Sequence, residues 1–146
     1  MDESVENLFN EEYNSGLEKE NTYLKFAQKT MQSKVDLYAL LKDIKKHHHR
    51  IYGISAPSRS STLISYTGID ENILDCVMEI SGSHKVGKYM PGTLIPVLDE
   101  QKLFKDQPEF ALILAWHIAD DLIRLLRKKG YKGKFIIPLP EPRIIE

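Results

Sequence analysis

The sequence predicts a three-layer, Rossmann-like α/β domain with a mostly parallel sheet, preceded by a long N-terminal helix. Two observations carry this prediction. After residue 50, short β-branched runs alternate with helical patterns, and strands that are separated by crossover helices form parallel sheets. The runs 110–115 and 135–137 are apolar without alternation, as expected for strands that are covered on both faces.

Two segments precede this domain. Residues 1–20 are acidic and weakly apolar, and Gly16 interrupts any helix there, so we expect a flexible or partner-dependent arm. Residues 21–49 are expected to form a long amphipathic helix that packs on, or links to, the domain of residues 50–146. Its apolar stripe is formed by Leu24, Ala27, Met31, Val35, Tyr38 and Leu41.

The domain itself is predicted to contain five strands, at residues 50–55, 73–80, 94–98, 110–116 and 134–139. The clearest helix follows residue 116, because Ile118, Leu122 and Leu125 mark one face of it. Acidic residues lie in its first turn and basic residues near its end, before Gly130. This order matches the helix dipole and a C-terminal glycine cap.

Composition excludes several classes of partner. The 146 residues carry 21 acidic and 20 basic side chains, which leaves no basic field for nucleic acid or for an anionic membrane. The longest apolar run, 110–116, is far shorter than the roughly 20 residues that span a bilayer. The acidic N-terminus does not resemble a secretion signal, and the single cysteine cannot form an internal disulfide. We therefore expect a cytoplasmic protein.

In an open parallel sheet the ligand crevice lies beyond the carboxyl ends of the strands, so the loops after the strands are candidate sites. The first loop, GISAPSRSST, combines free amides at a helix start with several hydroxyls and with Arg59, a set that suits a phosphate. It matches neither G-x-G-x-x-G nor the G-x-x-x-x-G-K-[ST] loop. Serines also cap helices for structural reasons, so both interpretations stay open.

The second loop, SGSHKVGKYMPGTLIP, contains Lys85, Tyr89 and Thr93 and is more polar than a simple connector needs. It could wrap a polar ligand, or it could be a solvated loop with a turn at Pro91 and Gly92.

Two further sites follow later strands. His117 and Asp120 lie three residues apart after Trp116, which allows an acid–base pair or a capping histidine beside a first-turn aspartate. The proline-rich end of the chain could place Glu141 and Arg143 at the rim of the crevice.

Two other features predict no chemistry. The consecutive histidines 47–49 diverge by roughly 100° per residue on a helix, so they are not expected to share a metal and more simply finish the long helix. Cys76 lies in an apolar run without a second cysteine, so we expect a buried, unreactive thiol.

Four segments carry a family resemblance: GISAPSRSSTLISYTGI, GSHKVGKYMPGTLIPV, FALILAWHIADDLI and FIIPLPEPRII. They resemble the C-terminal domain of the S-adenosylmethionine-dependent sugar C-methyltransferases, which methylate a carbon of a nucleotide-linked deoxyketosugar. The resemblance covers residues 22–146, and its most specific parts are P-G-T-x-I-P at 91–96 and P-x-P-E-P-R at 138–143. The first loop is similar to the family's G-A-P-A-K-G-N-T, with Arg59 where lysine is usual, Ser60 for the glycine and Ser61 for the asparagine.

The resemblance implies a nucleotide-sugar-binding module of deoxysugar biosynthesis. Its implied diphosphate contacts are Ser58, Arg59, Ser60, Ser61 and Thr62. Its implied sugar or nucleotide contacts are Lys85, Tyr89 and Thr93, and its implied crevice rim consists of Trp116, His117, Glu141 and Arg143.

The resemblance also implies what this chain is expected to lack. Family members carry a cysteine-rich zinc-binding domain and a methyl-donor domain before this region, and neither is expected here. The chain is therefore expected to bind no metal or cofactor alone, while a missing domain or a separate methyltransferase subunit supplies S-adenosylmethionine. The expected ligand is a nucleotide-diphosphate deoxysugar, and the arm and long helix would dock or link the two parts.

Two alternatives belong to other functional classes. One is a non-catalytic protein that kept the fold and binds a nucleotide or a phosphorylated metabolite. The other is a small independent enzyme that uses His117 and Asp120, although the sequence offers no complete set of nucleophile, base and orienting group.

Overall fold

A computed structural model describes residues 2–146. The chain forms two compact units, of which the first ends at Gln32 and the second comprises Ser33–Glu146. Each unit is described separately below. Within residues 2–146, none of the helices combines the length and the apolar character that a membrane span requires.

The first unit is helical. Helix α1, Glu3–Ser15, begins after Asp2, whose side chain accepts a hydrogen bond from the Ser4 amide, and it ends at Gly16 in the left-handed conformation (φ 73°). Gly16 is therefore the C-cap residue of α1. Glycine suits this position because it has no side chain to strain the left-handed conformation. Helix α2, Glu20–Lys46, starts in this unit and ends in the second. The predicted flexibility and partner dependence of the arm stay predictions.

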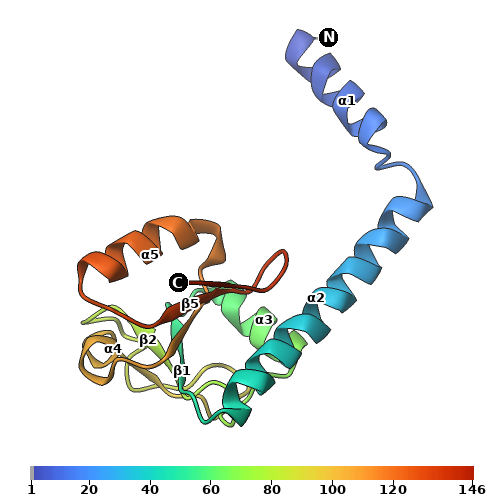
Figure 1. Cartoon of the computed structure of the whole chain (residues 1–146). Coiled ribbons are helices and arrows are strands. Elements are labelled where there is room, and N and C mark those ends of the chain that lie inside the picture. Colours follow the sequence, from blue (N-terminus) through green and yellow to red (C-terminus); the bar gives the residue numbers. More distant parts are fainter. Residues whose placement is uncertain (1) are drawn as a thin grey trace. The chain divides into compact units, whose positions relative to one another are not determined.

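The second unit is built on one six-stranded sheet (Figure 1). Its strands are β1 (Ile51–Ile54), β2 (Cys76–Glu79), β3 (Val97–Asp99), β4 (Phe110–Ile113), β5 (Lys134–Ile137) and β6 (Arg143–Ile145). They lie in the order β3-β2-β1-β4-β5-β6, and the first five are parallel. The predicted mostly parallel sheet and its five strands are confirmed.

Strand β6 was not predicted. It pairs antiparallel with β5, in a register that places Arg143 opposite Ile137. Its three residues follow a proline-rich turn and are partly exposed, so they lack the apolar run that identified the other strands.

Helices cover both faces of the sheet and give the three layers (Figure 1). Helix α3, Ser58–Thr67, and the last turns of α2 pack on one face through buried residues that include Leu41 and Ile64. Helices α4, Gln101–Asp106, and α5, Ala119–Lys128, pack on the other face through Leu103 and Leu126. A short 3-10 helix, Trp116–Ile118, leads from β4 into α5.

Only the C-terminal end of the predicted α2 stripe packs on the sheet, where Leu41 is buried and Tyr38 packs against the core. The buried residues of α2 are Leu37, Leu41 and Ile44, whereas Met31 and Val35 of the predicted stripe are exposed. A helix with apolar residues on two sides offers two possible stripes, and only the sheet beneath it selects one.

Candidate functional site

The sheet order places the candidate crevice between β1 and β4. The chain passes from β1 outward to β2 and β3 and then returns to β4 on the other side of β1, so the order reverses there. Such a switch point separates the loops that follow the two strands and opens a crevice beyond their carboxyl ends. Arg59 lies in the first turn of α3, directly after the loop that follows β1, and Trp116 begins the 3-10 helix that follows β4.

A cation–π contact joins these two segments. The Arg59 guanidinium carbon lies 5.9 Å from the centroid of the Trp116 ring, within the range of an attractive interaction. The sequence separates these residues widely, and the structure brings them together across the switch point.

The other residues of the first loop divide into two groups. Ser60 is fully buried, and its hydroxyl donates a 2.5 Å hydrogen bond to the Pro57 carbonyl, so it secures the first turn of α3. Ser58 and Thr62 are exposed and Ser61 is half-buried, so these hydroxyls remain within reach of a ligand. No side chain of the described residues caps α3, and the Ser60 amide donates to the Pro57 carbonyl, so the amides of Ser58 and Arg59 are the ones available to an anion.

A buried carboxylate fixes this loop from the next strand. Glu79, the last residue of β2, is 8% exposed and accepts a 2.9 Å hydrogen bond from the Ala56 amide. Lys85 donates a 2.7 Å hydrogen bond to the Ala56 carbonyl and lies 3.7 Å from Glu79. Ala56 is thus held at both its N–H and its C=O. Next to it, Ser55 adopts a left-handed φ of 69°, which such anchoring helps to hold.

These contacts revise the picture of the second loop. Lys85 holds the first loop in place rather than standing free, and Glu79 was not among the predicted site residues. Its only sequence signal is a single carboxylate at the end of an apolar run.

The remaining residues of the second loop lie elsewhere. Tyr89 is 62% exposed and forms a backbone bridge with Pro96. The Thr93 hydroxyl closes a turn, since it donates to the Met90 carbonyl at 3.0 Å and accepts from the Ile95 amide at 3.1 Å.

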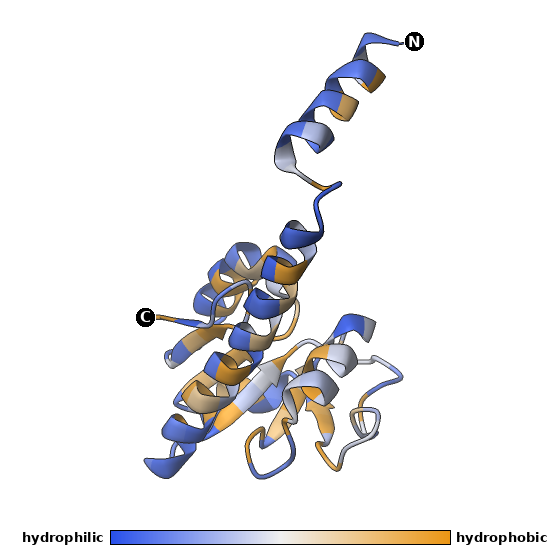
Figure 2. Cartoon of the chain, turned by 90° about the vertical axis from the view of Figure 1, so that its right-hand side faces the viewer, coloured by the Kyte–Doolittle hydropathy of each residue, from blue (hydrophilic) through white to orange (hydrophobic). Residues whose placement is uncertain are grey.

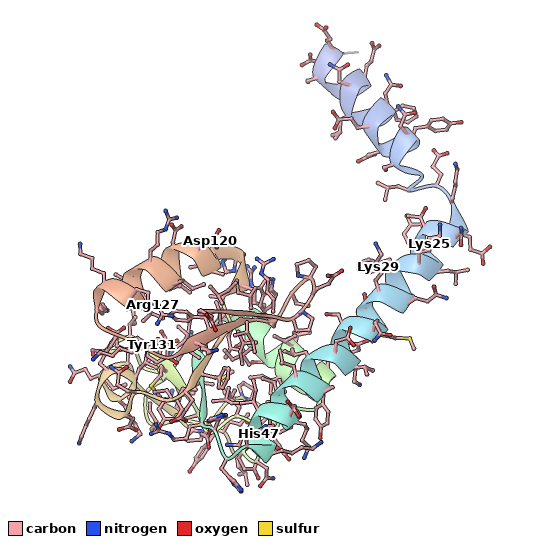
Figure 3. The ribbon with its side chains drawn as sticks, viewed as in Figure 1. Lys25, Lys29, His47, Asp120, Arg127 and Tyr131 are labelled. Carbon is pink, nitrogen blue, oxygen red and sulfur yellow. The ribbon has the colours of Figure 1, made fainter. Side chains whose placement is uncertain are left out.

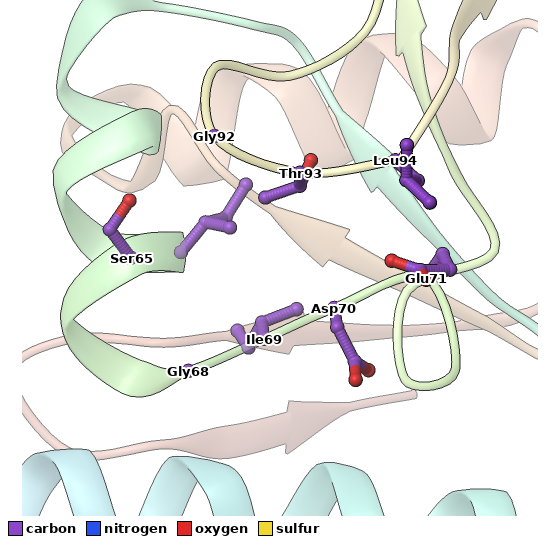
Figure 4. A pocket seen from close by; sticks show the side chains of 9 residues that line it. Ser65, Gly68, Ile69, Asp70, Glu71, Gly92, Thr93 and Leu94 are labelled. Atoms are coloured by element: carbon purple, nitrogen blue, oxygen red, sulfur yellow. The ribbon is translucent and has the colours of Figure 1, made fainter.

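Thr93 also lines a hollow of about 650 Å³ beside the C-terminal end of α3, together with Ser65, Ile69 and Asp70 (Figure 4). Arg59 lies at the other end of that helix, roughly 13 Å away at 1.5 Å per residue. Thr93 and Arg59 therefore line different parts of the surface.

The predicted site around His117 and the predicted site at the proline-rich end of the chain form one cleft. Trp116, His117, Asp120 and Arg143 line a space of about 440 Å³ at the carboxyl ends of β4 and β5. Arg143 reaches it because β6 runs back along β5. Glu141 is exposed in the turn before β6.

His117 and Asp120 are both exposed, and in the described part of the chain no hydrogen bond joins them. Figure 3 shows Asp120 at the start of α5. The neighbouring Arg124 is engaged with Asp121 at 2.8 Å. The cleft thus combines an aromatic face with polar groups of both charges, while the acid–base pair stays a prediction.

The two features expected to lack chemistry are located outside this cleft. Burial raises the pKa of the Cys76 thiol to about 12, which keeps it protonated and unreactive at neutral pH. His47 follows the last turn of α2, and its Nδ1 lies 2.9 Å from the Asp43 carbonyl oxygen. Within residues 2–146, no group of three or more His, Cys, Asp or Glu side chains is placed to hold a metal ion.

Comparison with known proteins gives two matches. The family model described as the C-methyltransferase C-terminal domain matches residues 1–140. The chain is also 28% identical over 145 residues to the C-methyltransferase NovU of Streptomyces niveus, an alignment that covers 97% of this chain and 34% of that protein. The chain therefore spans about a third of the length of this curated relative.

Proposed function

Since the chain belongs to the C-methyltransferase C-terminal domain family, we propose that it binds the nucleotide-sugar substrate of a C-methylation and that other protein supplies the methyl donor. The observation that carries this proposal is the Arg59–Trp116 contact across the switch point, where a cation and an aromatic ring lie beside each other. The ligand class is a nucleotide-diphosphate deoxysugar.

Each part of the ligand has a proposed partner. The diphosphate takes the Arg59 guanidinium and the first amides of α3, because a chain with a net charge of −1 must hold an anion locally. The Trp116 ring offers a stacking surface, and the adjoining cleft receives a polar ring against His117, Asp120 and Arg143. Glu79 and Lys85 orient the phosphate loop through Ala56.

Methyl transfer needs groups that we assign outside this chain. S-adenosylmethionine supplies an electrophilic methyl group, and we assign no residue of this chain to it. The chain spans about a third of the relative named C-methyltransferase, so a donor-binding part in another segment or subunit is consistent with that length. The role of this chain is to bind the sugar nucleotide and to present it.

A second candidate function is non-catalytic binding of a nucleotide or phosphorylated metabolite. The observation that favours it is the exposure of His117 and Asp120 without a mutual hydrogen bond, since an acid–base pair is usually oriented by such contacts. The two functions differ in the ligand that the cleft selects.

Thermal denaturation and calorimetry with nucleotide-diphosphate deoxysugars, compared across the common nucleobases, test the proposal. Ligand at a hundredfold excess over its dissociation constant adds about 2.7 kcal/mol of stability. Arg59→Ala is expected to weaken binding about 10- to 100-fold, because a hydrogen bond to a charged group contributes about 1.5–3 kcal/mol. Lys128→Ala, an exposed cation in the last turn of α5, is the matched control and should bind like the wild type.

Three results would contradict the proposal. Equal stabilisation by a mononucleotide and by the sugar nucleotide favours the second function. If Arg59→Ala binds the sugar nucleotide as tightly as the wild type, Arg59 is not part of the binding site. Firm stabilisation by S-adenosylmethionine alone places the donor site within this chain.

A further inference from the structure

The first unit carries an apolar face that nothing in it covers. On α1, Val5, Leu8, Phe9 and Tyr13 are 49%, 56%, 61% and 61% exposed. Their spacing of three and four residues places them along one side of the helix, and none of the residues of α1 is buried (Figure 2). A soluble helix normally buries such a stripe.

The first turns of α2 continue this pattern. Tyr23, Leu24, Phe26 and Met31 are 58%, 55%, 70% and 63% exposed. Tyr23 and Phe26 are three residues apart and share one face, whereas Leu24 and Met31 share a second face. Lys25 and Lys29 project from the same turns (Figure 3). A helix that is apolar on two sides is normally enclosed when it functions.

We call these eight apolar side chains of α1 and the start of α2 the N-terminal stripes. Four of them are aromatic, and a covered aromatic side chain buries roughly 150–250 Å². At their exposed fractions, the eight side chains offer on the order of 800 Å². Summed over the faces of the two helices, that area is about one side of a standard protein–protein interface.

The exposed apolar residues of the second unit do not form a comparable face. Among the described residues, Val35 lies on α2 one turn after Met31, and the others are spread over different helices, strands and loops: Tyr66, Ile80, Tyr89, Leu94, Ile118, Leu125 and Ile144. Isolated exposed apolar side chains are normal on a protein surface.

Charge indicates the chemistry of the partner. Glu3, Glu6, Glu11 and Glu12 lie on α1, which contains no lysine or arginine. By helical spacing Glu6 and Glu11 flank the α1 stripe and Glu12 lies within it, so a face that covers this stripe meets negative charge and is best matched by lysine or arginine. A second copy of α1 in that place would oppose like charges.

We propose that the N-terminal stripes are the docking surface for the methyl-donor protein, whose own face is apolar at its centre and carries lysine or arginine where it covers α1. This inference rests on the proposed function, which requires a donor-binding partner. It also agrees with length, because about two thirds of NovU has no counterpart in this chain. A partner of that kind must contact this chain for the donor and the sugar nucleotide to share one active site.

The test uses the full chain and, as the probe, NovU of Streptomyces niveus without the region that this chain matches. The fold of the probe is verified by its thermal stabilisation with S-adenosylmethionine. Sedimentation velocity is expected to show a one-to-one complex. The double substitution Phe9→Ser, Phe26→Ser should weaken it at least tenfold, and 0.5 M salt should weaken it by screening α1. Leu125→Ser is the matched control, because Leu125 is an exposed apolar residue of α5.

Three outcomes overturn the inference: no complex forms, the stripe variant binds the probe like the wild type, or the same two substitutions instead abolish self-association of the chain. Circular dichroism verifies that each variant keeps its helices. Sugar-nucleotide binding is measured on every variant and should not change. A chain that binds no sugar nucleotide but forms the stripe-dependent complex contradicts the proposed function alone, so the two failures are distinguishable.

Discussion

Removing the Glu79 carboxylate should destabilise the sheet and loosen the first loop. In Glu79→Ala, the Ala56 amide loses its 2.9 Å acceptor, and Ala56 is too buried to gain water in its place. An unsatisfied buried donor costs about 1–3 kcal/mol. The ion pair with Lys85 adds at most about 1 kcal/mol, because the Lys85 side chain is 41% exposed and stays hydrated. The Ile80 amide also loses its 3.2 Å acceptor on the same carboxylate, so the expected total loss is about 2–4 kcal/mol.

Thermal and urea denaturation measure this loss. For a domain of this size, each kcal/mol corresponds to about 4 °C, so the midpoint should fall by about 8–16 °C. Glu79→Gln keeps an acceptor oxygen for the Ala56 amide and should lose only about 1 kcal/mol. Asp121→Ala, which breaks the exposed pair with Arg124, is the control and should change stability by less than about 0.5 kcal/mol.

The comparison of the two Glu79 variants decides the argument. If Glu79→Ala and Glu79→Gln unfold at the same temperature, the hydrogen bond to Ala56 is not what makes the carboxylate important. If neither differs from the wild type, the proposed anchoring of the phosphate loop is wrong as well.

Three further substitutions test the rest of the fold. Leu41→Ala empties a fully buried position between α2 and the sheet and should cost about 2–5 kcal/mol in urea denaturation, and a loss below 1 kcal/mol would show that α2 does not pack there. Gly53→Ala places a methyl group 2.9 Å from the Leu114 side chain, so overpacking should cost about 1–3 kcal/mol by the same measurement, and a neutral result would mean that the sheet relaxes. The hydrogen bond from Arg50 lowers the pKa of Glu109 from 4.5 to about 2, so the unfolded chain binds the proton more readily, and the stability that this carboxylate contributes above pH 4.5 is lost as the pH falls towards 2. Because the Glu109 side chain is 37% exposed, the contribution is about 1 kcal/mol, and Glu109→Gln should remove this part of the acid sensitivity between pH 5 and pH 3.

Most of the fold was predictable because its signals are local. The uninterrupted apolar runs of β4 and β5 indicated strands covered on both faces, and the charge order of α5 marked both of its ends. Strand β6 was not predictable from such signals, since its three residues become a strand only by pairing with the edge of β5. The packed face of α2 was predicted only in part: Tyr38 and Leu41 pack as expected, whereas the roles of Leu37 and Ile44 became evident only from their contact with the core.

The sequence indicated which loops form the candidate site, but it did not indicate which of their residues contact each other. The rule that ligands bind beyond the carboxyl ends of parallel strands selected the loops containing Arg59 and Trp116. Their contact depends on β1 lying beside β4, a strand order that has no local signature. The same limitation hid Glu79, whose hydrogen-bond partner at Ala56 is distant in sequence. Thr93 was predicted as a ligand contact because it belongs to the P-G-T-x-I-P motif. In the structure its hydroxyl closes a turn, away from the other predicted contacts.

The antiparallel direction of β6 affects two properties: the exposure of the sheet edge and the charge of the cleft. The strand covers the open backbone edge of β5, whose Phe135, Ile136 and Ile137 are buried, and an uncovered apolar edge invites other chains to add to it. The same reversal makes Arg143, the first residue of β6, the one that arrives at the cleft. A trimmed or displaced tail would therefore lose a cation from the cleft and at the same moment create a template for aggregation.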